Sequence, residues 1–327
     1  MNSPCSATPS EIMAKPGKRI IRTSVDWSNT GMVLVQFLAG RFTYRTLEEW
    51  SERIKSGEIT LNGKPVSPEY LLQMHDCIEY HPQDIPEPPA RKDYRLVHED
   101  DDILVIDKPG NLCVHPSGPF FQNTLWYLLR QNYPDIHFVN RLDRETSGLL
   151  LAAKSPEAAR KIAETNAVSG KTYLAIVHGD FTEKIDASGF LVSANSVIRK
   201  KRHFIMDNPE NLPGETSITY LSPEKSGANF SLVRAVLGTG RTHQIRATLC
   251  SLGFPLVGDK LYGVDENFFL KQKSEDFTPE ELAQLILKRQ ALHSAGFDLI
   301  HPASGEKMEF TSPLPGELQS FVDKEIR

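Results

Sequence analysis

The chain has 327 residues, of which 39% are hydrophobic and 24% charged, and its formal net charge at pH 7 is −5. This length and hydrophobic fraction allow one sizeable core and a small additional module. The acidic balance argues against a protein that coats nucleic acid indiscriminately, because backbone binding depends on lysines and arginines displacing counterions. No apolar run approaches the ~20 residues needed to span a bilayer, and no leader peptide opens the sequence. We therefore expect a cytoplasmic protein without a membrane partner.

The cysteines and histidines form no metal-binding pattern. The four cysteines are scattered, and none belongs to a Cys-x-x-Cys pair, so neither a zinc site nor a disulfide framework is indicated. The ten histidines include no pair in the His-x-x-x-His spacing that places two ligands on one helical face. We therefore expect reduced thiols and no metal.

The residues from 19 to 81 predict a small module. Apolar residues recur at helical spacing over 33–37 and over 47–54. Next comes Asn62-Gly63, a pair that supplies the positive φ angles of a two-residue hairpin turn. A final strand at 76–80 would close the module.

Two further segments read as connections. Residues 1–18 are rich in proline, serine and other small residues and predict a disordered tail. Residues 82–93 contain several prolines and predict a semi-stiff linker. The linker marks a domain boundary, and residues 94–327 would form the main domain.

The main domain mixes strands and helices without strict alternation. Strands are expected at 103–106, 148–152, 171–177, 216–221, 230–237, 297–300 and 308–311. Helices are expected at 124–131 and at 156–164, the latter capped by Ser155 with Pro156 at its first position. A capping box at Thr278 and Glu281 opens another helix inside a surface segment, roughly 265–288. This pattern predicts an α+β domain around a mixed, largely antiparallel sheet, preceded by the small α/β module.

One carboxylate, Asp143, lies between Arg141 and Arg144 where a polar turn gives way to an apolar run. Nearby cations and the donors of the turn would lower its pKa and keep it ionised. An ionised carboxylate in such a place can serve as a nucleophile or a base. The same residues also fit a surface ion pair that caps a strand, and this fragment alone leaves both interpretations open.

Two later segments carry further candidates. The run from Lys171 to Val177 reads as a buried strand with Tyr173 near its start. The run from Gly238 to Arg246 reads as a glycine turn that leads into a helix, which Gly253 would end.

Taken in this order, the motifs resemble those of the RluA-type RNA pseudouridine synthases. The resemblance rests on Arg-Leu-Asp at 141–143 with Thr-Ser-Gly at 146–148, on Lys-x-Tyr at 171–173, and on Gly-Arg-Thr-His-Gln-Ile-Arg at 240–246. Further matches occur at 107–110, 114–116, 258–259, 261–263, 289–293 and 313–315. Together they cover about residues 95 to 320.

The resemblance implies an isomerase that acts on transfer RNA or ribosomal RNA. Such an enzyme detaches the uracil of a uridine, turns it and rejoins it through carbon five, and because no redox step is involved we expect no cofactor. By resemblance, Asp143 is the catalytic aspartate, either as a nucleophile on the anomeric carbon or as a base that gives a glycal-like intermediate. Tyr173 would stack on the target uracil, and Arg246 would pair with Asp143.

Other residues of these motifs would support binding. Arg141 would contact RNA phosphate or fill the gap left by the extruded base. Arg241 precedes the helix that holds Arg246, where backbone amides can bind phosphate. His243 and Gln244 fit the motif, and we expect them to orient Arg246 or the loop rather than to react.

The amino-terminal module resembles a small RNA-binding module of a ribosomal small-subunit protein. Arg45, Arg53 and Lys55 form a basic cluster that would contact RNA, and the run at 198–203 is a second basic segment. The alternative is a packing domain without nucleic-acid contact. RNA is the expected partner, and we expect a monomer.

One position departs from the family pattern. The family usually has histidine directly before Arg-Leu-Asp, whereas this chain has Asn140, which leaves open how the loop is braced. The segments at 115–118 and 123–124 look somewhat closer to the transfer-RNA-modifying branch.

Two other functions compete with the isomerase. A non-catalytic RNA-binding protein could keep this scaffold, but it would have no reason to retain all three expected side chains. A glycosidase would need a second carboxylate opposite Asp143, and Glu145 is too close in sequence to supply one across a sugar.

Overall fold

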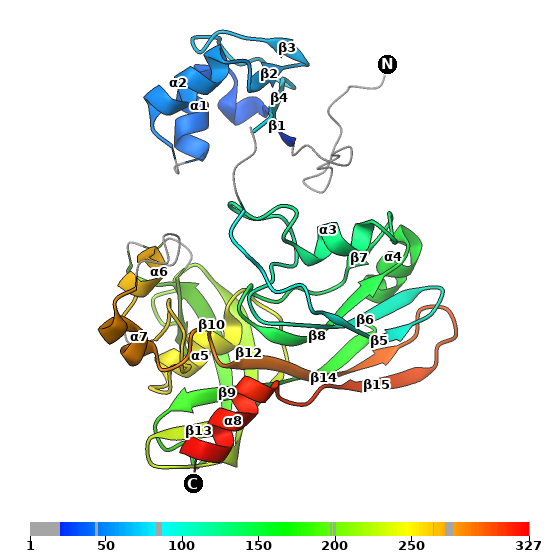
Figure 1. The fold of residues 1–327 in the computed structure, drawn as a ribbon, viewed down its shortest axis with the longest axis vertical. Helices are drawn as coiled ribbons and strands as arrows, with labels where there is room; N and C mark the ends of the chain where they lie inside the picture. Colours follow the sequence, from blue (N-terminus) through cyan, green and yellow to red (C-terminus); the bar gives the residue numbers. More distant parts are fainter. Residues whose placement is uncertain are drawn as a thin grey trace. The chain divides into compact units, whose positions relative to one another are not determined.

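The computed structural model describes residues 20–42, 45–82, 87–196, 198, 201–263, 265–271 and 277–326. The chain divides into two compact units, Met1–Pro86 and Glu87–Arg327 (Figure 1). The division falls within the segment 82–93 that the sequence predicts as a linker. The predicted tail, 1–18, lies outside the described residues.

The first unit pairs a small sheet with two helices. Its sheet has the strand order β1-β4-β2-β3. The elements are β1 Ile21–Ser24, a 3-10 turn at Trp27–Asn29, α1 Leu34–Arg41, α2 Leu47–Lys55, β2 Ile59–Leu61, β3 Lys64–Pro65 and β4 Cys77–Tyr80. Trp50 of α2 is fully buried at the centre of the core between the helices and the sheet.

Local signals account for this unit. Helix α2 begins at a capping box in which Glu49 N donates to Thr46 Oγ1 at 3.3 Å and Thr46 N donates to Glu49 Oε2 at 2.8 Å. The turn between β2 and β3 has φ 52° at Asn62 and 75° at Gly63, as the Asn-Gly pair predicts. The expected helix, helix, hairpin order is confirmed.

The second unit is built on one large sheet. From edge to edge its strands are β11 Arg202–Ile205, β10 Ile185–Ser193, β12 Gly214–Lys225, β13 Phe230–Leu237, β9 Val168–His178, β14 Leu292–Ile300, β8 Ser147–Ala153, β6 Ile103–Lys108 and β5 Arg95–Glu99, with β15 Lys307–Thr311 paired to β14 and β7 His137–Phe138 paired to β8. Among these described strands, β14 and β8 run parallel and the other pairs are antiparallel. The predicted α+β fold with a mixed, largely antiparallel sheet is confirmed.

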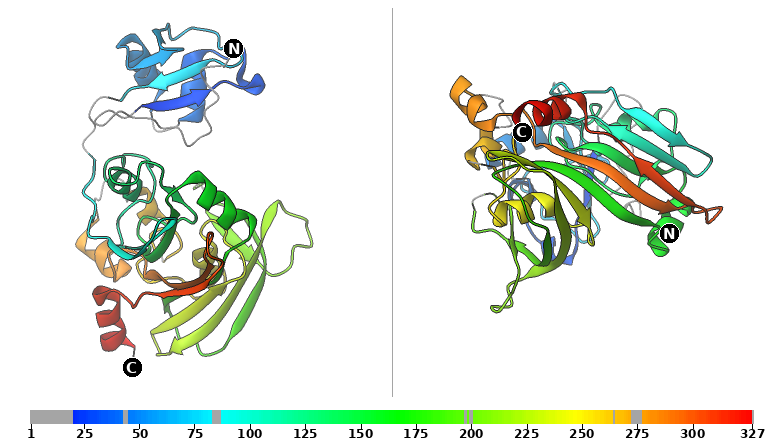
Figure 2. Two further views of the ribbon diagram at one scale, coloured as in Figure 1. Left: turned by 90° about the vertical axis from the view of Figure 1, so that its right-hand side faces the viewer. Right: turned by 90° about the horizontal axis from the view of Figure 1, so that it is seen from below.

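Helices cover both faces of this sheet. They are α3 Leu125–Arg130, α4 Pro156–Glu164, α5 Gln244–Ser251, α6 Asn267–Lys271, α7 Pro279–Leu285 and α8 Gly316–Glu325. Helices α3 and α5 pack in the core cluster that holds Leu104 and Ile106, whereas α4 packs against Ile103 and Val105, which point to the other face of β6. Helix α8 likewise packs opposite α5 (Figure 2). Strands buried on both sides explain the continuous apolar run of β8.

Pairing across the sheet adds strands that the sequence did not indicate. Strand β10 carries Asp186, Ser188 and Gly189, which obscure any alternation, yet it pairs along its length with β12. Gly189 lies so close to β11 that an added Cβ would stand 2.2 Å from the carbonyl oxygen of Ile205. Helix α8 was also missed, because no side chain caps its first turn.

Part of the predicted linker is built into the second unit. The Glu87 carboxylate accepts hydrogen bonds from the backbone nitrogens of Phe121, Gln122 and Asn123 at 2.7–2.9 Å. Residues 87–93 are therefore grouped with the main domain. Among the helices of the described ranges, none combines the length and apolarity that a bilayer crossing requires.

Candidate active site

A pocket of about 80 Å³ opens where strands β8, β9, β13 and β14 meet the start of α5. Its lining contains seven of the ten residues that the sequence predicts for the site: Arg141, Asp143, Tyr173, Arg241, His243, Gln244 and Arg246. Leu142, Thr146, Leu237, Ile245 and Leu292 complete it. Residues from distant parts of the chain thus share one cavity.

Asp143 sits on the loop that joins β7 to β8. Two hydrogen bonds attach the loop to β8. Val139 N donates to Leu151 O at 2.9 Å, and Leu151 N donates to the Asn140 side-chain oxygen at 3.0 Å. Asn140 therefore braces the loop at the position where the family pattern has histidine. The loop closes with Thr146 N donating to Asp143 O at 3.1 Å, and the Asp143 side chain is 34% exposed toward the pocket.

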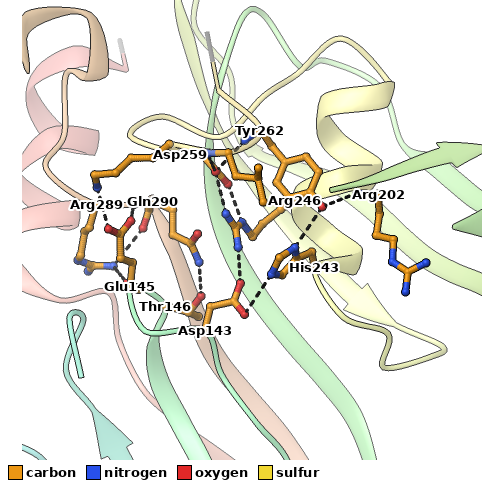
Figure 3. Close-up of polar contacts among 12 residues, drawn as sticks. Asp143, Glu145, Thr146, Arg202, His243, Arg246, Asp259, Tyr262, Arg289 and Gln290 are labelled. Atoms are coloured by element: carbon orange, nitrogen blue, oxygen red, sulfur yellow. Dashed lines mark hydrogen bonds and ion pairs between the residues drawn. The ribbon is translucent and has the colours of Figure 1, made fainter. Parts of the chain in front are cut away.

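Arg246, in the first turn of α5, lies between two carboxylates (Figure 3). Its Nε and Nη2 donate to the two Asp259 oxygens at 2.7 and 2.9 Å, and its Nη1 donates to Asp143 Oδ2 at 2.6 Å. Asp259 is itself fixed by the backbone nitrogens of Leu261 and Tyr262. The bidentate pair fixes the plane of the guanidinium, so that the remaining nitrogen, Nη1, points at Asp143.

This arrangement keeps Asp143 ionised. Burial favours the neutral acid, but the positive charge of Arg246, with His243 and the hydrogen bonds as smaller contributions, more than offsets burial and lowers the Asp143 pKa. From the sequence, we expected the flanking arginines and the donors of the turn to do this. Arg144 instead packs over the Phe120 ring at 5.2 Å, because the loop turns it away from the pocket.

Tyr173 belongs to β9 and points into the same pocket. Burial raises the pKa of its phenol to about 12, a hydrogen bond with Ser294 lowers it in part, and the charge of Asp143 raises it further. The phenol is therefore protonated at neutral pH. It can donate a hydrogen bond or offer its ring for stacking beside the carboxylate.

The turn before α5 is organised by Gln244. Its side-chain oxygen accepts from Thr239 Oγ1 and from Arg241 N, both at 2.9 Å, and its side-chain nitrogen donates to the carbonyl of Ile218. Arg241 is held at the rim, where its guanidinium lies 3.6 Å from Glu215 Oε1. The Gln244 side chain thus ties the turn to Ile218 of β12.

His243 occupies the N-cap of α5 in the left-handed region, with φ 58°. Its Nδ1 lies 3.1 Å from the Tyr262 hydroxyl, and its Nε2 lies 3.8 Å from Asp143 Oδ1 (Figure 3). Arg246 of α5 therefore faces Asp143 Oδ2, and His243, the N-cap of the same helix, faces Oδ1.

A buried polar network supports the loop from behind. Glu145 Oε1 accepts from Lys260 Nζ at 2.7 Å and Glu145 Oε2 accepts from Gln290 N at 3.1 Å. The Gln290 side chain donates to Thr146 Oγ1, and Arg289 donates to the Glu145 carbonyl at 2.9 Å. Glu145 thus binds Lys260 and Gln290 outside the pocket lining.

Asp259, Lys260, Tyr262, Arg289 and Gln290 had no assigned role in the sequence analysis. All of them except Lys260 lie in the motifs at 258–259, 261–263 and 289–293, so a signal was present for those four. The roles were missed because each depends on a contact across the fold, such as that between Lys260 and Glu145, 115 residues apart.

The basic cluster of Arg45, Arg53 and Lys55 belongs to the first unit. Arg53 Nη1 contacts both Glu58 oxygens at 2.6 and 2.7 Å, Arg45 lies over the Trp50 ring at 5.9 Å, and Lys55 is exposed. In the other basic segment, Lys201 pairs with Glu266 at 2.6 Å, while Arg199 and Lys200 lie outside the described residues.

One group of described residues has the composition of a metal site: Asp100, Asp102 and His301. His301 Nδ1 accepts from the backbone nitrogens of Ala303 and Ser304 at 3.3 and 3.1 Å. The proton of the neutral ring is therefore on Nε2, which lies 3.3 Å from Asp100 Oδ2. This arrangement suits an N–H donor to the carboxylate, whereas a metal ligand would need the Nε2 lone pair.

Comparison with known proteins identifies the family. The family model described as RNA pseudouridylate synthase matches residues 102–251, which include Asp143, Tyr173 and Arg246. An uncharacterized RNA pseudouridine synthase from Chlorobaculum parvum is 32% identical over 90% of this chain and 94% of its own length. The ribosomal large subunit pseudouridine synthase D of Pseudomonas aeruginosa is 32% identical, over 87% of this chain and 89% of its own length.

A solved structure agrees. Human RNA pseudouridylate synthase domain containing 1 superposes with a TM-score of 0.53 at 25% identity, covering 70% of this chain and 86% of the human chain. The chain therefore belongs to the RluA-type RNA pseudouridine synthase family and is an isomerase that acts on RNA.

Proposed function

We propose that this synthase isomerises specific uridines of structured ribosomal or transfer RNA, with Asp143 as the reacting carboxylate. The observation that carries the proposal is the state of Asp143. It is ionised, one-third exposed to the pocket, and held through Oδ2 by an arginine whose other nitrogens are fixed by Asp259. Such a carboxylate is oriented before the substrate arrives.

The isomerisation breaks the bond between the anomeric carbon and N1 and forms a bond between that carbon and C5. The proton on C5 is lost and N1 gains one, so the reaction needs no oxidant or reductant. Asp143 would act either as a nucleophile on the anomeric carbon or as a base toward the ribose. Both routes need an ionised oxygen, and Oδ1 is the one that the Arg246 nitrogens do not contact.

Tyr173 and Arg141 would hold the flipped nucleotide. Taking a uridine out of a structured RNA costs about a few kcal/mol, and stacking on an aromatic ring returns about 1–3 kcal/mol. Tyr173 lies in the pocket wall with a neutral phenol, and Arg141 is exposed at the rim. Arg141 would contact RNA phosphate or replace the extruded base in the stack.

The relatives point to ribosomal RNA as the first substrate to test. Several relatives are named ribosomal large subunit pseudouridine synthases, including synthase C of Vibrio cholerae, 31% identical over 83% of this chain. The first unit, through its basic cluster, would bind the RNA away from the reacting nucleotide and increase the affinity.

The experiment maps pseudouridine across total RNA from cells that lack the gene. The cells are complemented with the wild-type gene, with Asp143→Asn, or with the matched control Asp180→Asn, which changes an exposed aspartate in a turn after β9. We expect at least one lost position, restored by the wild type and the control but not by Asp143→Asn. Restoration by Asp143→Asn would refute the role of the aspartate, and a lost position in transfer RNA alone would redirect the substrate.

A further inference from the structure

The Tyr262 hydroxyl lies against the Nδ1 nitrogen of His243. Within the described part of the chain, its oxygen has two hydrogen-bond partners: the backbone nitrogen of Arg202 at 2.9 Å and His243 Nδ1 at 3.1 Å. A backbone N–H can only donate, so the Tyr262 oxygen accepts from Arg202. Of the two partners, the imidazole nitrogen is the one that can receive the phenol proton.

Tyr262 has that proton to give. Burial raises the pKa of its phenol to about 12, with smaller opposing contributions from Arg202 N and Arg246, so the group is neutral at physiological pH. When it donates to Nδ1, the neutral His243 ring carries its own proton on Nε2. That nitrogen is the one that faces Asp143 Oδ1 at 3.8 Å.

Both the backbone conformation and the ring contacts of His243 fix the position of its side chain. A non-glycine residue with φ 58° is uncommon, and here it turns the ring between Tyr262 and Asp143. The Tyr262 ring also meets the His243 ring edge-on at 5.6 Å and lies 5.1 Å from the Arg246 guanidinium. Asp143 and Tyr262 therefore both face the imidazole, and Arg246 lies beside both of them.

We propose that Tyr262 is a positioning residue that fixes His243 in its Nε2–H tautomer, so that His243 presents an N–H to the Asp143 oxygen not held by Arg246. The opposite tautomer would place a lone pair against the carboxylate and repel it. With Nε2 protonated, neutral His243 cannot serve as the general base. The inference rests on the proposed reacting role of Asp143.

The direct test reads the histidine tautomer in the full chain labelled with ¹⁵N-histidine. Long-range proton–nitrogen spectra distinguish a protonated from an unprotonated ring nitrogen, and His243→Gln identifies the signals among those of the ten histidines. At a pH where the spectra show a neutral ring, we expect the proton of His243 on Nε2 in the wild type and a mixture of tautomers in Tyr262→Phe. A wild-type ring protonated on Nδ1 would overturn the proposal, as would an unchanged ring in the variant.

Kinetics give the second readout. Phenylalanine keeps the ring beside His243 and Arg246 and removes the hydroxyl, so Tyr262→Phe should lower the single-turnover rate about tenfold, in the range typical of lost outer hydrogen-bond partners, with unchanged RNA affinity. The loss should disappear at a pH where the spectra show a doubly protonated ring, because Nε2 then always carries a proton. An equal loss at every pH would mean a merely structural role.

Matched variants complete the design. Tyr133→Phe removes a phenol that donates to Glu99 at 3.0 Å, and it should leave the rate unchanged. His243→Gln can place an N–H near the Nε2 position and should retain more activity than His243→Asn, which cannot reach it. Equal rates for these two would count against the inference. If Asp143→Asn were active, the proposed function would fail while the tautomer measurement stood.

Discussion

Two arginines in the two units show different designs for an ion pair. Arg246 uses three nitrogens on two carboxylates, and one of these, Asp259, is completely buried and tied to the backbone. Arg53 of the basic cluster uses one nitrogen on Glu58, and its side chain is 30% exposed. The contacts of Arg246 fix the orientation of the Asp143 carboxylate. The pair of Arg53 and Glu58 leaves a partly exposed guanidinium that could reach an RNA phosphate.

The contrast between the two arginines predicts that losing the Asp259 charge costs much more stability than losing the Glu58 charge. Asp259→Asn keeps the shape of the side chain but removes one of the two charges that compensate buried Arg246. Breaking a buried pair costs about 3–5 kcal/mol, so the free energy of unfolding should fall by that amount. Glu58→Gln should cost about 1 kcal/mol or less, because Arg53 reaches solvent. Urea titrations of both variants check this, and equal costs would break the distinction.

Arg246 should be more sensitive to its shape than Arg53. Lysine keeps the charge but cannot contact Asp143 and both Asp259 oxygens with a planar fork. We expect Arg246→Lys to lower the single-turnover rate about 100-fold, as loss of an oriented donor typically does, while Arg53→Lys leaves the rate unchanged. A wild-type rate for Arg246→Lys would show that charge alone suffices.

Acid should remove the contribution of the buried Arg246–Asp259 pair to the free energy of unfolding. Arg246 and the hydrogen bonds lower the pKa of Asp259 below its unfolded value, despite the opposing effect of burial. Its contribution is therefore fully present above the unfolded pKa, about 3.9, and is lost as pH falls through the folded pKa. The difference in unfolding free energy between wild type and Asp259→Asn should be constant near neutrality and narrow below about pH 5. A difference that widens in acid would contradict this assignment.

The smallest effect concerns the basic cluster. Lys55→Ala should weaken RNA binding a few-fold and reduce the salt dependence by roughly 0.7 log units per log unit if the lysine contacts one single-strand phosphate. Turnover at saturating RNA should not change. Lys324→Ala, which removes an exposed lysine of α8, serves as the control. Identical salt slopes for both variants would argue that the first unit does not bind RNA through this residue.

The sequence predicted more of the fold than of the contacts inside the pocket. Caps and turns are local, so helix α4 with Ser155 and the Asn62-Gly63 turn were correct. The gathering of Asp143, Tyr173 and Arg246 followed from ordered motifs. The pairing of Arg246 with Asp143 was predicted, but its second partner was not, because Asp259 stands 13 residues away on a loop whose path depends on packing. The left-handed His243 was likewise hidden, because the segment was predicted as a glycine turn, yet the positive φ falls on His243 and not on Gly238 or Gly240.

The most direct test of the account is the single-turnover rate of pseudouridine formation by purified Asp143→Asn at a saturating enzyme concentration. The substitution keeps the size of the side chain and removes its charge, and RNA binding measured in parallel confirms that the complex forms. We expect normal binding with no detectable product. Product at the wild-type rate would show that the reacting group lies elsewhere.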